Sequence, residues 1–315
     1  MKRVAIVVIT YGSADVIGPC LDSLAGIQDA EIVVVDNASA DETCAEVARR
    51  NVRLTANRHN AGFAAAVNQG VRETSAPLIL LLNPDARLET GLDPLIACLD
   101  ESGKTAAAGG LLTGPDGVPQ TGFMARNLPT AMALTFEVLG INRLWPGNPV
   151  NWHYRCKGND PMVSAFVEQP AGAFFLFRRS AWQELGGFDE SFWPVWFEDV
   201  DFCARLRKAG YSVRYEPAAR AAHQGGHSVS AIPREIREKY WYGSLLKYAA
   251  KHYHPVAFAL VCLSVAAGAA GRAVLAFPRG GLKVFRVYSS VIRLSFAHLR
   301  GALVPGRPSS GPAAG

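Results

Sequence analysis

The chain has few charged residues, no closely spaced cysteine pair and no internal repeat. Charged residues make up 19% and hydrophobic residues 49% of its 315 positions, which excludes a disordered chain and provides a core for one large or two small domains. The six cysteines are scattered without a C-x-x-C pair, which excludes a disulfide-stapled mini-protein and favours reduced thiols in a cytosolic compartment. The apolar run Val4–Ile9 is too short for a signal peptide and no small-residue cleavage site follows it, so we interpret it as a buried strand.

Two common nucleotide-binding motifs are also missing. No G-x-G-x-x-G follows the first apolar run, and G-x-x-x-x-G-K-[ST] occurs nowhere in the sequence. These absences remove the main support for a dinucleotide-binding domain and for a P-loop. A nucleotide bound to this chain would therefore be held by carboxylates and a metal ion instead of a glycine-rich loop.

Short apolar runs alternate with longer amphipathic segments over the first 110 residues. Strands that alternate with helices, and that are apolar on both faces, indicate a doubly wound, mostly parallel α/β sheet. Ser39 and Glu42 have the spacing of a capping box, which supports a helix start at this point. We expect strands at Val4–Thr10, Glu31–Asp36 and Leu78–Leu82, and helices at about Ala14–Ala25, Asp41–Arg50 and Gly62–Thr74.

Polar side chains follow each of these three strands. In such a sheet, ligands bind in the crevice outside the carboxyl ends of the strands. Asp and Asn at a single strand end are often only turn formers, but three polar ends in one crevice favour a binding site. The residues concerned are Thr10 and Tyr11, then Asp36 and Asn37, then Asn83, Pro84 and Asp85.

The middle of the chain is less regular. Residues 113–160 are rich in Gly, Pro and Asn, and a long irregular insertion of this kind is usually functional or mobile. Residues 166–178 are expected to form a strand, a turn at Gly172 and a second strand. A further strand is expected at residues 211–215, with His223 and His227 just beyond it.

An acidic cluster, Glu198–Asp201, is expected to open a helix that runs to about residue 209. Its carboxylates, Asp85 and the imidazole of His223 are donors that suit a hard or borderline divalent cation, and such a cation in turn neutralises a diphosphate. Taken alone, the cluster is also explained as a solvated turn whose charges favour a helix N-terminus, and His223 as a structural histidine.

Seven motifs occur in an order that resembles the family 2 glycosyltransferases of the GT-A fold, and most closely their bacterial rhamnosyltransferase-like branch. The resemblance runs from Val4 to about Ser228 and departs from the commoner D-x-D motif at Asn83, which makes His223 more important. The motifs are V-V-I-T-Y-G at 7–12, V-V-V-D-N-A-S-A-D-E-T at 33–43, N-R-H-N-A-G-F-A-A-A-V-N-Q-G at 57–70, L-L-L-N-P-D at 80–85, Q-P-A-G-A-F-F-L-F-R-R at 169–179, G-G-F-D-E-S-F at 186–192 and W-F-E-D-V-D-F-C-A-R-L at 196–206.

The resemblance implies a site for an activated sugar nucleotide across the strand ends. Asp85 would bind Mg²⁺ or Mn²⁺, which bridges the diphosphate, with His223 as a second ligand and His227 as a lesser candidate for a phosphate contact. The residues implied for nucleotide-sugar binding are Thr10, Tyr11 and Asp36 at the base and ribose, with Asn60, Gly62 and Asn83 nearby.

The resemblance also implies an inverting reaction with one base. Asp199 would be that general base, removing the proton of an acceptor hydroxyl as it attacks the anomeric carbon. Glu198 and Asp201 stay alternatives for the base, and a pair of carboxylates acting together would instead favour hydrolysis. Gly172, Trp196 and Glu198 are candidates for contacts with the acceptor or the sugar, although Trp196 is equally explained by core packing.

The last quarter of the chain has a different charge from the rest. Residues 231–315 contain 12 Lys and Arg against Glu235 and Glu238, a balance of +10, whereas residues 1–230 have a balance of −5. Residues 234–251 are expected to form an amphipathic helix. The following 17 uncharged residues, 255–271, would span about 26 Å as a helix, short for a hydrocarbon core of about 30 Å, so an interfacial or re-entrant helix is favoured over a span.

A final helix predicts attachment to an anionic membrane surface. Its basic stripe and its apolar residues fall on opposite sides at 100° per residue, which is typical of helices lying on lipid, although a solvated face packed on the catalytic domain is the alternative. No nucleic-acid-binding motif accompanies the charge, so nucleic acid is not an expected partner. The basic residues are Arg279, Lys283, Arg286, Arg293 and Arg300, and the apolar ones Phe285, Tyr288, Val291, Ile292 and Phe296.

Together these features predict a GT-A catalytic domain at 1–230, a helical membrane-associating region at 231–302 and a disordered tail at 303–315. The expected function is an inverting, metal-dependent glycosyltransferase at the cytoplasmic face of the plasma membrane. It would move a sugar, plausibly L-rhamnose from dTDP-rhamnose, onto a lipid-linked saccharide for cell-envelope polysaccharide synthesis. The alternatives are another donor (UDP-galactofuranose, UDP-GlcNAc or a GDP-sugar), a non-catalytic nucleotide-sugar-binding membrane scaffold, and a lipid-surface hydrolase. The sequence carries no signal for oligomeric state.

Overall fold

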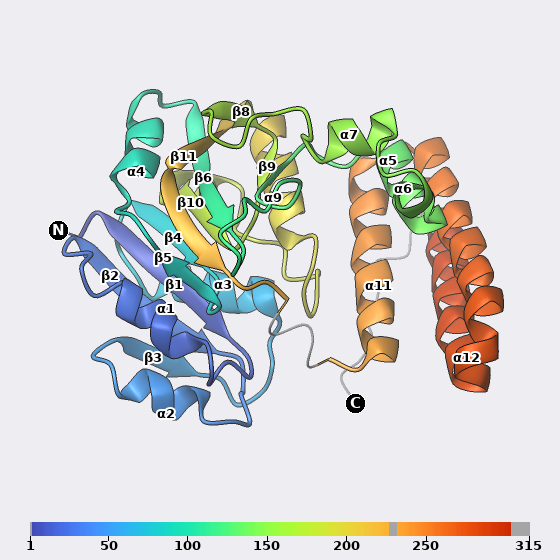
Figure 1. Ribbon diagram of the computed structural model, residues 1–315, viewed down its shortest axis with the longest axis horizontal. Helices are drawn as coiled ribbons and strands as arrows, with labels where there is room; N and C mark the ends of the chain where they lie inside the picture. The colour runs from blue at the N-terminus through green and yellow to red at the C-terminus, as the bar shows by residue number, and fades with distance from the viewer. Residues whose placement is uncertain (1, 227–231, 304–315) are drawn as a thin grey trace. The chain divides into compact units, whose positions relative to one another are not determined.

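The computed structural model describes residues 2–226 and 232–303, and the side chains of all of these except 279, 280, 302 and 303. The chain divides into two compact units (Figure 1). The first consists of Met1–Leu128, Arg155–Glu190 and Glu198–Ala231, and the second of Pro129–Tyr154, Ser191–Phe197 and Ile232–Gly315. His227 and the expected tail after residue 303 lie outside the described residues.

The first unit is built on a mixed sheet that has nine strands in the described residues. Its strands are β1 (Val4–Thr10), β2 (Ala30–Asp36), β3 (Arg53–Ala56), β4 (Leu78–Leu82), β5 (Ala86–Leu88), β6 (Thr105–Thr113), β8 (Ala165–Val167), β10 (Phe174–Arg178) and β11 (Ser212–His223). Their order is β3-β2-β1-β4-β10-β6-β11-β5, with β8 paired to β11. β1 to β4 pair in parallel, β10 is antiparallel to both its neighbours, and β11 is parallel to β6. A small second sheet pairs β7 (Ala125–Arg126) with β9 (Gln169–Pro170).

The expected α/β architecture is confirmed, because the apolar runs are buried on both faces. Val4–Thr10 and Leu78–Leu82 are strands over their whole predicted length, and every residue in both is buried. Gly70 lets its helix approach the sheet, because a Cβ at this position would lie 2.6 Å from Cγ1 of Val7. The helices of this unit are α1 (Ile17–Ser23), α2 (Thr43–Ala48), α3 (Phe63–Arg72), α4 (Asp93–Asp100), α8 (Arg179–Glu184) and α9 (Glu198–Lys208).

The predicted capping box is wrong. Helix α2 begins at Thr43, one residue after Glu42, and the cap residue Glu42 makes no side-chain hydrogen bond to the helix. The hydroxyl of Ser39 donates instead to the carboxylate of Asp36, at the end of β2. The backbone N–H of Thr43 is satisfied by Asp41, so the local polar side chains serve the loop before the helix.

Two further expectations change in the structure. Residues 113–160 are not only irregular, since three helices of the second unit begin in this segment. The strand expected at 211–215 extends from Ser212 to His223, because its second half pairs with β6 and β5 after an irregularity between Glu216 and Arg220. His223 is therefore the last residue of a strand and not a loop residue beyond one.

The second unit is helical. Its helices are α5 (Ala131–Leu139), α6 (Ile141–Leu144), α7 (Pro149–Tyr154), α11 (Arg234–His252) and α12 (Pro255–Leu303). α12 breaks at Gly281, which has φ 54° and ψ −146°, and its two halves fold back side by side (Figure 1). The hydroxyl of Ser295 donates to the carbonyl oxygen of Cys262 at 2.6 Å and joins the two halves. By length and composition alone the first half, Pro255–Pro278, can cross a membrane, and 50% of its apolar window is buried.

The expected separation of basic and apolar sides on the final helix is wrong in part. Tyr288 and Val291 are 3% and 0% exposed, because this side of the helix packs inside the unit. Phe285 and Phe296 are 51% and 42% exposed. They share the solvent-facing side of the helix with four exposed basic residues, Lys283, Arg286, Arg293 and Arg300.

Candidate active site

The ends of β1 and β2 meet through a buried hydrogen bond. The two strands are in parallel register with Thr10 opposite Asp36. The Thr10 hydroxyl donates to Oδ1 of Asp36 at 2.8 Å, and the backbone N–H of Ser39 donates to Oδ2 at 2.9 Å. Thr10 and Asp36 are 0% and 1% exposed, so both order the loops at this edge of the sheet.

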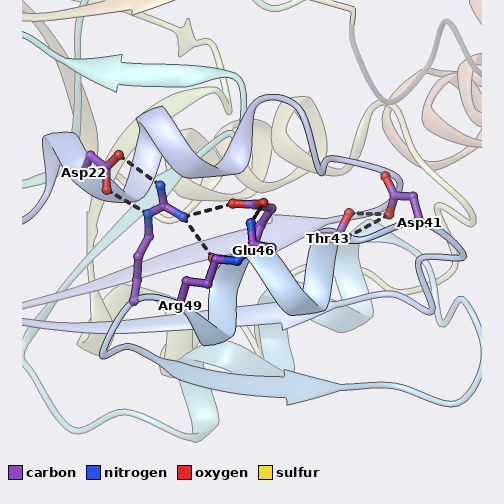
Figure 2. A network of polar contacts seen from close by, with 6 residues as sticks. Asp22, Asp41, Thr43, Glu46 and Arg49 are labelled. Carbon is purple, nitrogen blue, oxygen red and sulfur yellow. Dashed lines mark hydrogen bonds and ion pairs between the residues drawn. The ribbon is translucent and has the colours of Figure 1, made fainter.

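The loop after β1 is tied to the loop after β2 by consecutive backbone donors. The N–H groups of Gly12 and Ser13 donate to the hydroxyls of Ser39 and Thr43, both at 2.8 Å. The next N–H, of Ala14, donates to Asp41 at 3.1 Å. Figure 2 shows the adjoining polar network, in which Asp41 contacts Thr43 at the start of α2.

The same network joins α1 to α2. The guanidinium of Arg50 forms two hydrogen bonds to Asp22 on α1, at 2.7 and 3.0 Å. It also donates to Oε2 of Glu46 on α2 at 3.3 Å, and Figure 2 labels both Asp22 and Glu46 in this network. Helices α1 and α2, which follow the loops after β1 and β2, are therefore linked to each other. This link holds the two loops at the edge of the sheet.

The remaining residues predicted for nucleotide-sugar binding lie close by at this edge. Tyr11 is 40% exposed and directly follows the buried Thr10. Gly62, with φ 91°, caps α3, and its N–H donates to Oδ1 of Asn60 at 2.9 Å. Asn37, at the end of β2, donates to the carbonyl oxygen of Gly62 at 3.1 Å and so connects this turn to the strand ends.

Asp85 and His223 meet although 138 positions separate them. β5 pairs antiparallel with the end of β11, which places Ala86 opposite His223 and brings the preceding Asp85 to the histidine ring. Nε2 of His223 lies 3.5 Å from Oδ1 of Asp85, with the two side chains 2% and 4% exposed. Oδ2 of Asp85 accepts from the N–H of Gly225 at 2.9 Å, and Nδ2 of Asn83 lies 3.4 Å from Nε2 of His223.

This pair fits a divalent cation. Burial lowers the pKa of His223, with attraction to Asp85 opposing it, so the imidazole is neutral near pH 7 and keeps a lone pair. Oδ1 of Asp85 and Nε2 of His223 lie 3.5 Å apart, near enough that both would hold one cation. The thiol of Cys20 donates to the carbonyl oxygen of Asn83, and burial raises its pKa to about 12, so it offers no thiolate.

The donor set also fits the kind of metal predicted. Within the described part of the chain, no group of three or more His, Cys, Asp or Glu side chains is placed to hold a metal ion. One or two protein ligands are typical of Mg²⁺ at phosphate sites, where substrate phosphates and water complete the shell. Asp85 supplies one such carboxylate and His223 a neutral nitrogen beside it, a donor pair compatible with Mg²⁺ or Mn²⁺ bound together with a diphosphate.

Asp199 lies in the first turn of α9 with both carboxylate oxygens held. Oδ2 accepts from Nε2 of Gln169 at 3.1 Å and from the N–H of Gly172 at 3.3 Å. Oδ1 accepts from the N–H of Val200 at 2.8 Å. Gly172 allows this close approach, since a Cβ there would lie 3.3 Å from Oδ2 of Asp199. Asp199 as a whole is half-buried.

The other acidic residues of the cluster have different surroundings. Asp201 is 0% exposed and forms an ion pair with Arg205 at 2.8 Å, so its carboxylate is neutralised by the guanidinium of that arginine. Arg205 also donates to the carbonyl oxygens of Leu185 and Gly187, which joins α9 to the preceding turn. Glu198 is 4% exposed at the start of α9. Trp196 lies in the Ser191–Phe197 segment of the second unit and has a φ of 80°.

The Asp85–His223 pair lies just after β4, and Asp199 contacts Gly172 just before the neighbouring strand β10. β4 pairs with β10, and the N–H of Asn83 donates to the carbonyl oxygen of Ala173 at 3.0 Å. Ala173 directly follows Gly172, whose N–H contacts Asp199. The structure therefore brings the predicted metal ligands and the predicted base to one edge of the first unit.

Two contacting residues were missed from the sequence. Gln120 bonds both the ring and the backbone of His223, and Gln169 bonds Asp199. Gln169 opens one of the motifs quoted above, which is the sequence signal that points to it, and in the structure it is fully buried, where a polar side chain needs a partner. Gln120 falls in the 113–160 segment, whose length marked it as functional without indicating which residue acts.

Family models and curated proteins match the sequence of this chain. A model described as glycosyl transferase family 2 matches residues 5–186, and one described as glycosyl transferase family group 2 matches residues 151–299. The chain is 30% identical over 248 residues to N-acetylglucosaminyl-diphospho-decaprenol L-rhamnosyltransferase of Mycobacterium tuberculosis (strain ATCC 25618 / H37Rv), covering 72% of this chain and 78% of that protein. It is 26% identical over 235 residues to rhamnosyltransferase WbbL of Escherichia coli (strain K12), covering 71% of this chain and 84% of that protein.

A solved structure has the same fold. Mannosyltransferase PcManGT from Pyrobaculum calidifontis, in complex with GDP-Man and Mn²⁺, superposes with a TM-score of 0.52 at 18% identity, covering 96% of this chain and 86% of that one. Since the first family model spans more than half of the residues, and since the strand-end site described above lies on the matching fold, this chain belongs to glycosyl transferase family 2 and is a glycosyltransferase.

Proposed function

We propose that this enzyme transfers L-rhamnose from dTDP-rhamnose to a lipid-linked saccharide in cell-envelope polysaccharide synthesis, with inversion at the anomeric carbon. The observation that carries the proposal is the Asp199 carboxylate, which Gln169 and Gly172 hold just before β10 begins, while the Asp85–His223 pair lies just after the neighbouring strand β4. Both relatives named above are rhamnosyltransferases, which supports the donor. The name of the mycobacterial relative includes an N-acetylglucosaminyl-diphospho-decaprenol acceptor, which supports a polyprenyl-linked one.

Asp199 acts as the general base in this proposal. It takes the proton of the acceptor hydroxyl while the hydroxyl oxygen attacks the anomeric carbon and the nucleoside diphosphate departs. Gln169, Gly172 and Val200 hold the carboxylate by three hydrogen bonds, so it does not have to reorient during the reaction. Asp201 is not the base, because Arg205 already occupies its carboxylate.

The nucleotide-sugar donor binds at the carboxyl ends of β1 and β2 and at the N-terminal end of α3 in this proposal. Tyr11 is exposed and contacts the base, while the buried Thr10 and Asp36 shape its loop. Asn60, Gly62 and Asn83 line the ribose and diphosphate side of the same edge. Glu198 and Gly172, both in the first unit, contact the acceptor or the transferred sugar.

Asp85 and His223 hold Mg²⁺ or Mn²⁺ in this proposal. The bound cation supplies Lewis-acid stabilisation of the leaving diphosphate. Gly225 keeps Asp85 in place through its N–H, and burial keeps His223 neutral and able to bind.

The test of the base compares Asp199→Asn with Asp100→Asn. Asn keeps the size of the side chain but does not accept the proton, so kcat is expected to fall by about 10²–10⁴ while nucleotide-sugar binding persists. Asp100 is exposed and distant from the strand ends, so the control is expected to keep its activity. Unchanged transfer by Asp199→Asn would remove Asp199 from the mechanism.

The second unit carries the proposed attachment to the cytoplasmic face of the membrane. Exposed Phe285 and Phe296 share one side of α12 with Lys283, Arg286, Arg293 and Arg300, and aromatic and basic residues on one side match the interface of an anionic bilayer. All six cysteines are free, which fits a reducing compartment.

A charge-matched comparison tests this attachment. Replacing Lys283, Arg286, Arg293 and Arg300 by Gln is expected to weaken binding to phosphatidylglycerol vesicles at least tenfold at low salt, since each basic residue near the surface contributes about 1 kcal/mol. The control replaces four exposed arginines of the first unit, Arg49, Arg53, Arg72 and Arg87, by Gln and changes the net charge equally. Equal vesicle flotation of both variants would contradict the assignment of this surface.

A further inference from the structure

We propose that Gln120 is a positioning residue that fixes the tautomer of His223, so that the ring carries its proton on Nδ1 and presents an unprotonated Nε2 to the site. The inference rests on the proposed metal site and names a residue outside the ligand pair. It is carried by a two-point contact between one amide and one histidine. Both contacts belong to residues of the first unit.

The backbone contact fixes the orientation of the amide. Nε2 of Gln120 donates to the carbonyl oxygen of His223 at 2.8 Å. A carbonyl oxygen only accepts hydrogen bonds, so the NH₂ group of the amide must face it and the amide does not flip. Oε1 of Gln120 then faces Nδ1 of His223, at 2.9 Å.

The ring contact fixes the proton. An amide oxygen also only accepts, so a hydrogen bond at this distance requires Nδ1 of His223 to be the donor. In the neutral imidazole Nε2 then has the lone pair. Its surroundings agree, because Nδ2 of Asn83 lies 3.4 Å away as a donor and Oδ1 of Asp85 lies 3.5 Å away as an acceptor. A lone pair beside a carboxylate oxygen is an arrangement that a bound cation stabilises.

A tight turn after β6 places Gln120 beside His223. The N–H of Gly117 donates to the carbonyl oxygen of Gly114, and the chain reverses so that the N–H of Gln120 donates to the carbonyl oxygen of Leu112 at 2.9 Å. On its other side Leu112 pairs with Ala221 in β11, two residues before His223. The backbone of Gln120 is thus anchored to the same strands that position the histidine.

Phe123 completes the support of the ring. Its ring stacks on that of His223 with centroids 5.3 Å apart and an interplanar angle of 5°. The N–H of Phe123 donates to the carbonyl oxygen of Gln120, so both residues that contact the His223 ring belong to one turn. The ring of His223 therefore has its plane set by Phe123 and its protonated edge set by Gln120.

Removing such an outer partner of a histidine ligand typically weakens metal binding about 10–100-fold. Gln120→Leu is close in size and removes both hydrogen bonds. Gln120→Glu keeps an acceptor for the Nδ1 proton, but it loses the bond to the carbonyl oxygen and adds a negative charge. Gln183→Leu is the control, since Gln183 is exposed on α8.

Two measurements test the positioning of His223 by Gln120. The first is ¹⁵N NMR of His223 in the metal-free protein at pH 8, assigned by comparison with His223→Gln. The wild-type protein and Gln120→Glu are expected to show a protonated Nδ1 and an unprotonated Nε2. Gln120→Leu is expected to shift toward the opposite tautomer. Wild-type protein with the proton on Nε2, or an unchanged tautomer in Gln120→Leu, would overturn the proposal.

The second measurement is the Kd for Mn²⁺ in the presence of a nucleoside diphosphate, by electron paramagnetic resonance. Gln120→Leu is expected to raise the Kd about 10–100-fold, whereas Gln120→Glu stays within about threefold of the wild type and Gln183→Leu does not change it. An unchanged Kd in Gln120→Leu would overturn the proposal. Asp85→Asn separates the two claims: if it leaves the Kd unchanged, the metal site itself is misassigned, and the metal-free NMR result still decides the tautomer.

Discussion

A single methyl group at Gly172 tests the placement of the proposed base. Gly172 donates its N–H to Oδ2 of Asp199 at 3.3 Å, and a Cβ on Gly172 would lie 3.3 Å from the same oxygen and 3.4 Å from Cβ of Asp199. These contacts are shorter than ordinary van der Waals separations by a few tenths of an ångström. Gly172→Ala therefore displaces the carboxylate without removing it.

The expected effect is a loss of activity larger than the loss of stability. A misplacement on the order of 1 Å costs about 10²-fold in rate, so a displacement of a few tenths is expected to lower kcat about tenfold. Gly172 has no positive φ, so Ala adopts its backbone conformation without strain. The free energy of unfolding is expected to change by less than about 1 kcal/mol, a Tm shift below about 4 °C.

The assay is transfer kinetics at saturating donor, with Tm measured on the same samples. Gly103→Ala is the matched control, because no atom lies within 4 Å of a Cβ at that position. An unchanged kcat in Gly172→Ala would show that the position of the Asp199 carboxylate does not determine the rate of transfer. A Tm loss well beyond 4 °C would show that the methyl group disturbs the fold and not only the carboxylate.

Three further predictions concern stability. Asp201→Ala leaves the charge of Arg205 without its buried partner and is expected to lower the free energy of unfolding by about 3–5 kcal/mol, measured by urea titration. Gly70→Ala places a Cβ 2.6 Å from Cγ1 of Val7 and is expected to cost about 1–3 kcal/mol in the same assay; a neutral result would contradict the packing of α3 on β1. Burial lowers the pKa of His223 below its ordinary value of 6.5, so the unfolded chain binds more protons. Stability is therefore expected to fall as the pH drops through 6.5 and below, and His223→Gln should reduce this slope.

The sequence predicted those parts of the fold that depend on local patterns. β1 and β4 were predicted at their observed bounds because their apolar runs are long enough to be buried on both faces. The acidic start of α9 was predicted because carboxylates favour the first turn of a helix. Ser39 shows the limit of such patterns, since its hydroxyl had a tertiary partner, Asp36, in place of a helix N–H.

The pairings between distant strands were not visible in the sequence. The contact between Asp85 and His223 depends on the register of β5 against β11, which no local pattern encodes. The contacts of Gln120 depend likewise on a turn that returns the chain to Leu112. The exposed side of α12 depends on the break at Gly281, because the fold-back buries Tyr288.

The central claim is sugar transfer with inversion to a lipid-linked acceptor. The most direct measurement incubates the purified protein with Mn²⁺, a polyprenyl-diphosphate N-acetylglucosamine acceptor and a panel of labelled nucleotide sugars that includes dTDP-rhamnose. NMR of the product then gives the anomeric configuration of the transferred sugar. Labelled rhamnose is expected on the lipid-linked acceptor with its configuration inverted. Release of free sugar to water, retention of configuration, or binding of donors without any transfer would contradict the proposed function.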